Sequence, residues 1–140
     1  MIDYGAIRLD TAGGTGFRFG ARFASGHEAT YDSGAGAAGP NPVEHLLGAL
    51  AACEAMDVVG ILRKKRLEVT AYEVLMSGER APEAPRRFTA VELVHRVTGR
   101  DLPPAAVAEA LRLSEEKYCS VRHSLDPALR VTSRFELVQG

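Results

Sequence analysis

The sequence has no tryptophan, only two cysteines and no excess of either charge. Its 17 basic residues are balanced by 18 acidic residues, which gives a net charge of −1. A nucleic-acid-binding surface needs clustered basic residues, and an anionic membrane surface attracts polybasic segments. The sequence has neither, so we expect no nucleic acid and no membrane among the partners of this protein.

Long hydrophobic runs and targeting features are also missing. The longest nearly uncharged apolar run, Leu46 to Cys53, has eight residues, far fewer than the about 20 that cross a bilayer. The first residues, Met1 to Tyr4, do not begin a cationic and then apolar secretory signal. We therefore expect a cytoplasmic protein.

The two cysteines, Cys53 and Cys119, lie 66 positions apart, and the sequence has no Cys-x-x-Cys pair. This spacing excludes a zinc ribbon and a thioredoxin-type motif. A permanent structural disulfide is not expected in a reducing compartment. The thiols are therefore either buried core residues or participants in chemistry.

The 140 residues, 46% hydrophobic and 25% charged, are enough for one globular domain with one core, predicted over residues 1–140. In the first third, Phe17, Phe19, Ala21 and Phe23 recur at every second position, and Gly13-Gly14 and Ser25-Gly26 are turn signals. This pattern predicts short strands joined as hairpins.

A long helix is predicted to follow. Asn41 can cap its N-terminus, Pro42 suits the first helical position, and Glu44 can return to the backbone N–H of the cap. The helix reaches the cationic cluster at residues 63–66, which favours a helix C-terminus. Its apolar residues cover more than one stripe, so we expect a central helix that is buried nearly all round.

Strands are predicted over residues 68–76, 88–98 and 131–138, with a loop over residues 77–87. A second helix is predicted to begin at a cap on Asp101 and to end before Asp126-Pro127. Its apolar stripe recurs at steps of four and three: Val107, Leu111, Ser114, Tyr118, Val121 and Leu125. The order of elements predicts an α+β fold with a mainly antiparallel sheet, built from the N-terminal hairpins and the later strands around the two helices.

Two patterns in the sequence match ligand-binding motifs only in part. The pattern Gly34-x-Gly36-x-x-Gly39 matches a dinucleotide fingerprint as text, but prolines separate it from the helix, so a flexible loop is the better interpretation. Cys119 and His123 have helical i, i+4 spacing, but a tetrahedral zinc site would also need Cys53 and His45. We expect neither a metal nor a cofactor.

A reactive Cys53 would need a source of activation elsewhere in the fold. It lies mid-helix, beyond the first turn where the helix dipole acts, and Glu54 or Asp57 would oppose its ionisation if either faced the thiol. Four residues of the sequence could supply the activating positive charge, namely Arg18, Arg22, Arg122 and His123.

Cys119 lies beside the apolar stripe of the second predicted helix. If the two helices pack together, Cys119 could approach Cys53. A thiol that forms a sulfenic acid and a partner thiol that condenses with it make a minimal two-cysteine peroxide cycle. Burial of both thiols in an inert core remains the alternative.

Two cysteine motifs carry a resemblance to a known family. The segments Gly39–Leu47 and Ala49–Cys53 resemble the central-helix motif of the OsmC/Ohr proteins, the osmotically inducible and organic hydroperoxide resistance proteins. The segment Glu116–Val121 resembles their second cysteine motif. The resemblance covers nearly the whole chain and is strongest to the YhfA-like branch.

The resemblance implies an intertwined homodimer with active sites at the subunit interface. It makes Cys53 the peroxidatic thiol and Cys119 the resolving thiol of a peroxidase that defends against oxidative stress. The substrate is then an organic hydroperoxide, and a dithiol reductant such as a lipoyl protein reopens the disulfide.

The partners of the reactive thiol depart from the family pattern. Val43 stands where the family has its active-site glutamate, and Glu44 follows one residue later. Arg22 and Arg18 are the candidates for the family's arginine. Val43 motivates the alternative function, a ligand-binding or redox-sensing dimer with little catalysis.

Overall fold

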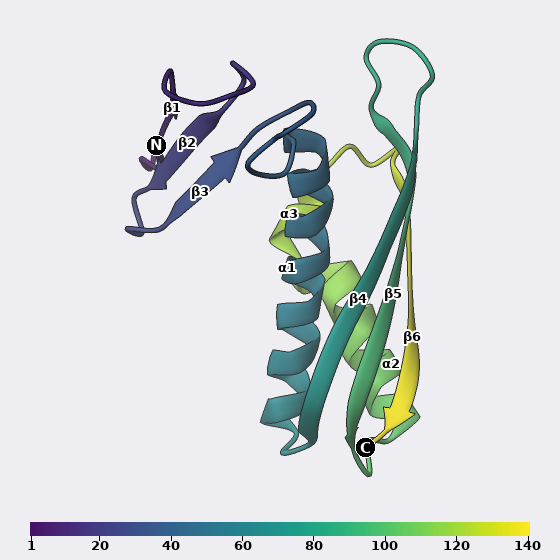
Figure 1. Cartoon of the computed structure of the whole chain (residues 1–140). Helices are drawn as coiled ribbons and strands as arrows, with labels where there is room; N and C mark the ends of the chain where they lie inside the picture. The colour runs from purple at the N-terminus through teal and green to yellow at the C-terminus, as the bar shows by residue number, and fades with distance from the viewer. The chain divides into compact units, whose positions relative to one another are not determined.

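The computed structural model describes all 140 residues, and the chain forms two compact units, Met1–Leu46 and Leu47–Gly140 (Figure 1). The α+β class is confirmed, but the strands form two separate three-stranded sheets, β1-β2-β3 and β4-β5-β6. The single domain over residues 1–140 stays a prediction. The elements in chain order are β1 (Gly5–Leu9), β2 (Phe19–Phe23), β3 (Glu28–Tyr31), α1 (Pro42–Lys64), β4 (Glu68–Arg80), β5 (Phe88–Arg100), α2 (Pro104–Leu113), the π-helical turn η1 (Ser114–Tyr118), α3 (Ser120–His123) and β6 (Arg130–Gln139).

The first unit is the predicted set of hairpins. β2 pairs antiparallel with β1 and β3, and only Ala21 of the β2 face is buried. Four large apolar side chains of this sheet are exposed: Ile7, Leu9, Phe19 and Phe23. Within one chain, this sheet therefore leaves much of its apolar surface open to solvent.

The glycine-rich segment after β3 is held in place, contrary to the expected flexible loop. The buried carboxylate of Asp32 accepts hydrogen bonds from the Thr15 hydroxyl and from the backbone N–H groups of Ser33 and Ala38. These bonds, with that of Thr15 the strongest, lower the pKa of Asp32 to about 2. Gly39 lies so close to the Thr30 carbonyl that a Cβ atom would stand 2.4 Å from its oxygen.

Helix α1 begins at the predicted cap. The Asn41 Oδ1 atom accepts a hydrogen bond from the Glu44 backbone N–H at 2.9 Å. The Glu44 carboxylate bonds the Asn41 side-chain amide at 2.6 Å rather than the backbone N–H expected from a capping box. Both bonds fix the first turn and use the Glu44 carboxylate as part of the cap.

The expectation that α1 is buried all round is wrong for the single chain. Its buried side contains Leu50, Ala51, Glu54, Val58 and Leu62, whereas Met56 on another side is 73% exposed. By length and composition the helix could cross a membrane, a property that core helices of soluble proteins share.

The sheet of the second unit is mixed rather than antiparallel throughout. β4 and β5 form a long antiparallel pair, and β6 pairs with the other edge of β5 in parallel. The parallel direction follows from the connection, because the chain between β5 and β6 crosses over through α2, η1 and α3 (Figure 1).

The single helix predicted from Asp101 to the Asp126-Pro127 break is wrong. Asp101 has a positive φ of 54°, and α2 begins only at Pro104. After the π turn η1, Cys119 has an extended backbone, with φ −70° and ψ 97°. The extra residue of the π turn shifts the helical phase, so Tyr118 is 48% exposed instead of lying in the apolar stripe.

Two hydrophobic clusters join the helices of the second unit to its sheet. In one cluster Val58 and Leu62 of α1 pack with Val97 of β5 and with α2. In the other, Leu50 and Ala51 pack with Val91, Leu93 and Cys119, and Cys53 lies at the cluster's edge. The second cluster brings the two cysteines together.

Candidate active site

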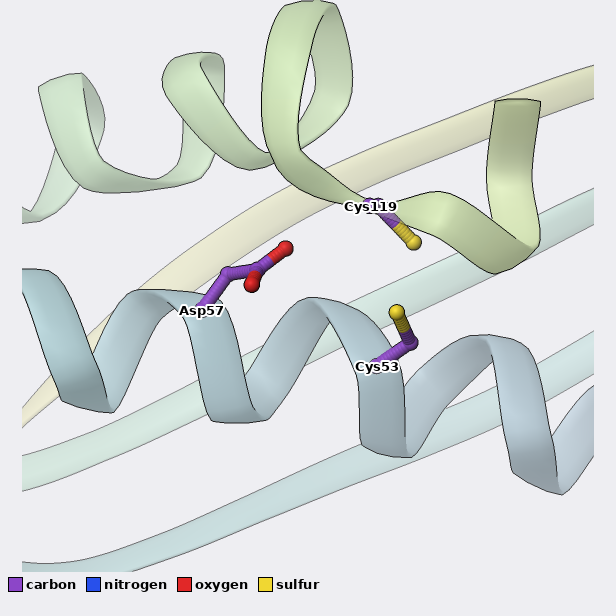
Figure 2. A group of neighbouring side chains, drawn as sticks. All are labelled: Cys53, Asp57 and Cys119. Carbon is purple, nitrogen blue, oxygen red and sulfur yellow. The ribbon is translucent and has the colours of Figure 1, made fainter.

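The two thiols meet between α1 and the segment that precedes α3 (Figure 2). The sulfur atoms of Cys53 and Cys119 and a carboxylate oxygen of Asp57 all lie within 4.8 Å of one another. Both cysteines are free; Cys53 is half-buried and Cys119 is fully buried. The pair therefore has one thiol that solvent reaches and one that it does not.

Cys119 caps the short helix α3. Its Sγ atom accepts a hydrogen bond from the backbone N–H of Arg122 at 3.3 Å. Burial raises the pKa of Cys119 to about 12, and the nearby Cys53 and Glu54 act in the same direction, against the Arg122 hydrogen bond. Cys119 is therefore a thiol, not a thiolate, at neutral pH.

Asp57 faces the two sulfur atoms from one turn after Cys53 on α1 (Figure 2). Its Oδ2 atom accepts a hydrogen bond from the Ser114 hydroxyl at 2.8 Å, and Ser114 itself is fully buried in η1. The sequence raised the question of whether an acidic neighbour faces Cys53; Asp57 is that neighbour.

Glu54 is completely buried on the sheet side of α1. It accepts a hydrogen bond from the Ser133 hydroxyl at 3.0 Å, and Arg122 Nη1 lies 3.6 Å from its carboxylate. Burial raises the pKa of Glu54, whereas Ser133 and Arg122 oppose that rise. The Arg122 guanidinium also donates to the Val131 carbonyl at 2.9 Å, so it is engaged with this polar network.

The remaining candidate residues of the sequence have partners of their own. In the first unit, Arg22 pairs with Glu28 at 2.5 Å and Arg18 lies 3.6 Å from the buried Asp32. Glu44 belongs to the helix cap described above. The structure thus gives each of these three side chains a structural role within the first unit.

The two histidines of the zinc set, His123 and His45, make contacts within their own units. In the second unit, the His123 Nε2 atom lies 3.0 Å from the Glu115 carbonyl. In the first unit, the His45 ring packs on Tyr31 with centroids 4.7 Å apart.

A buried histidine lies on β5. His95 is 1% exposed, and its Nδ1 atom lies 2.8 Å from the Tyr72 hydroxyl. Its Nε2 atom has no hydrogen-bond partner. Burial lowers the pKa of His95 to about 4, so the ring is neutral at pH 7.

From the sequence, Asp57 belongs near the site only if it faces the Cys53 thiol, and Ser133 is not expected there. The i, i+4 spacing of Cys53 and Asp57 on a predicted helix is a signal that could have placed the carboxylate beside the thiol. Ser133 had no such signal, because its contact with Glu54 depends on the parallel docking of β6 against β5.

Two neighbouring thiols, one on α1 and one at the cap of α3, packed against a mixed sheet, define a dithiol protein with an OsmC-like fold. The profile of the family described as OsmC-like protein matches residues 34–134, and the chain belongs to this family. It is 47% identical to protein YhfA of Escherichia coli K12 over 123 residues, which cover 88% of this chain and 92% of that protein. The resemblance stated from the sequence is confirmed.

Solved structures agree with this assignment. A hypothetical protein from Aquifex aeolicus is 27% identical, with a TM-score of 0.83 and 99% of each chain covered. The organic hydroperoxide resistance protein OhrB of Bacillus subtilis is 17% identical, with a TM-score of 0.59 and coverage of 96% of this chain and 97% of that one. The similarity to OhrB shows the fold alone.

Proposed function

We propose that this protein is a thiol-dependent peroxidase that reduces organic hydroperoxides. The Cys53 thiolate attacks the hydroperoxide, so that the O–O bond breaks and Cys53 becomes a sulfenic acid; the alkoxide takes up the proton that the thiol released on ionisation and leaves as an alcohol. The Cys119 thiol then attacks the Cys53 sulfur. A disulfide forms, and the sulfenic hydroxyl leaves as water with the proton of Cys119.

The proximity of the two sulfur atoms is the observation that carries this proposal. They lie within 4.8 Å of each other, and closing a disulfide requires a sulfur–sulfur distance of about 2.05 Å. A rotation of the side chains and a small shift of Cys119, which lies between helical segments, can supply this approach. The OsmC-like family and the hydroperoxide-resistance name of its structural neighbour OhrB support the same chemistry.

The order in which the two thiols react follows from the exposure of Cys53 and from the burial and protonation of Cys119. A hydroperoxide can reach the half-buried Cys53, whereas Cys119 is sealed and keeps its proton. The activating cation in this proposal is Arg22 or Arg18, as the family resemblance implies, and either would have to leave its carboxylate partner, Glu28 or Asp32, to act. Alanine at Arg22 or Arg18 is expected to slow the first oxidation step without removing it.

Single-turnover oxidation of the reduced protein tests the proposal. One equivalent of cumene hydroperoxide should produce a Cys53–Cys119 disulfide, detected by mass spectrometry. The two cysteine variants are matched controls: Cys53→Ser should give no oxidation, and Cys119→Ser should stop at a sulfenic acid that dimedone traps. The absence of both a disulfide and a sulfenic acid would refute the peroxidase.

Regeneration requires a dithiol reductant, for which dihydrolipoamide is the probe. A dithiol reopens the disulfide by exchange and leaves as its own cyclic disulfide. We expect multiple turnovers with dihydrolipoamide and slower ones with glutathione. Equal rates with both reductants would argue against a dedicated dithiol partner.

We further propose that the working form is a homodimer. The exposed Met56 borders a groove of about 480 Å³ between α1 and β4, lined by Ala55, Val59, Gly60 and Val74 among others. An apolar surface of this kind on a central helix suits burial against a second copy. Light scattering should give the mass of a dimer, and Met56→Lys should shift it toward the monomer. A wild-type monomer would contradict the proposal.

The second candidate function is a redox-sensing or ligand-binding dimer with little catalysis. The observation in its favour is that the charged side chain within 4.8 Å of the Cys53 sulfur is the carboxylate of Asp57 and not a cation. A sensor would be oxidised once and would turn over slowly even with dihydrolipoamide. Binding of a small molecule that survives Cys53→Ser would also favour this function.

A further inference from the structure

We infer that the reduced form of this protein binds a divalent metal ion, Zn²⁺ or its probe Cd²⁺, through Cys53, Asp57 and Cys119. The three ligand atoms, two sulfurs and one carboxylate oxygen, lie within 4.8 Å of one another. Thiolates with a single carboxylate suit a borderline-soft ion such as Zn²⁺ or its probe Cd²⁺. This inference depends on reduced thiols and is independent of peroxidase activity.

The spacing of the three groups fits tetrahedral coordination after a small contraction. Bond lengths of about 2.3 Å for Zn–S and about 2.0 Å for Zn–O place ligand atoms roughly 3.5 to 3.8 Å apart. The sulfur–sulfur pair must therefore close by about 1 Å at most and each sulfur–oxygen pair by about 1.3 Å at most. Cys53 and Asp57 share one face of α1, and Cys119 faces them from the start of α3 (Figure 2).

Neighbouring groups already orient two of the three ligands. The Ser114 hydroxyl donates a hydrogen bond to Oδ2 of Asp57 and fixes the direction of the carboxylate. The Arg122 backbone N–H bonds the Cys119 sulfur and fixes its direction. Such hydrogen bonds from outside the ligand set typically strengthen metal binding tenfold or more.

Access and charge also suit a cation. Cys53 and Asp57 are half-buried, so one side of the cluster is open to solvent for the ion and for a water molecule as fourth ligand. The one guanidinium beside the cluster, that of Arg122, is paired with Glu54 and lies 4.0 Å from Glu115. Binding releases one proton from each thiol to solvent, and no electron transfer is involved.

The test titrates the reduced full-length protein with Cd²⁺ under anaerobic conditions. A thiolate-to-cadmium absorption band in the near ultraviolet should saturate at one ion per chain, and competition with a chromophoric chelator should give the Zn²⁺ affinity. Cys53→Ser and Cys119→Ser should each abolish the band. Asp57→Asn should weaken affinity at least tenfold, while Asp126→Asn, at an exposed carboxylate, should leave it unchanged.

Cadmium-113 NMR of the unsubstituted protein provides a second measurement in case Asp57→Asn does not fold. Its chemical shift should indicate two sulfur ligands with oxygen ligands. No saturable band, a band that survives either cysteine substitution, or equal affinity of the folded Asp57→Asn variant and the wild type would each overturn the inference. Failure of peroxide oxidation would leave all of these readouts unaffected.

Discussion

His95 makes the stability of this protein depend on pH in a direction that the structure defines. The ring is 1% exposed, and burial holds its pKa near 4, against an ordinary value of 6.5. The unfolded chain therefore takes up the proton first as pH falls. The stability that comes from neutral His95 is complete above about pH 6.5 and is lost as pH falls toward 4.

The size of this effect follows from the same two pKa values. The difference corresponds to roughly 3 kcal/mol of unfolding free energy lost between pH 7 and pH 4. Urea unfolding followed by circular dichroism at both pH values measures the loss. Many carboxylates also titrate in this range, so the comparison is with His95→Gln, which cannot take up this proton.

The wild type should lose roughly 3 kcal/mol more than His95→Gln over this pH interval. His27→Gln is the matched control, because His27 lies in an exposed turn and bonds only the Ser25 hydroxyl. It should behave like the wild type. Equal losses in the wild type and in His95→Gln would refute the argument that burial keeps this ring neutral.

Three further substitutions test the packing and the capping. Leu62→Ala should lower the unfolding free energy by about 2–5 kcal/mol, because Leu62 is fully buried in the cluster with α2. A loss under about 1 kcal/mol in urea unfolding would contradict this packing. Asn41→Ala should lower the unfolding free energy by about 1 kcal/mol, because the helix loses its cap. An unchanged thermal midpoint would show that the cap is dispensable. Ser133→Ala should lower the unfolding free energy by about 1–3 kcal/mol, because the buried Glu54 carboxylate loses its hydrogen-bond donor. A denaturant titration at pH 7 measures this loss. An unchanged midpoint would contradict the role of Ser133.

The strands and the start of α1 could be predicted because their signals are local. Alternating residues and turn glycines suffice for the N-terminal hairpins, and Asn41 with Glu44 suffices for the helix cap. The second helix was not predictable to the same degree. Its break at Cys119 follows a π turn, and no single residue there forbids a continuous helix.

The sequence was enough to predict the two cysteines of the site but not the residues that surround them. The two motifs identified Cys53 and Cys119, but the contact between them depends on α1 and the α2–α3 segment packing on the same sheet. Arg122 was available as a cation by sequence, yet its partner Glu54 lies 68 positions away. Such pairings are set by tertiary packing, which one sequence does not specify residue by residue.

The parallel docking of β6 also has a consequence for folding. A parallel strand pair needs a completed crossover, so the contacts between β5 and β6 form between residues far apart in the chain and carry a large loop-closure cost. Cys119 lies within this crossover. The two thiols therefore come within reach of each other as the crossover closes, which links their proximity to completion of the native topology.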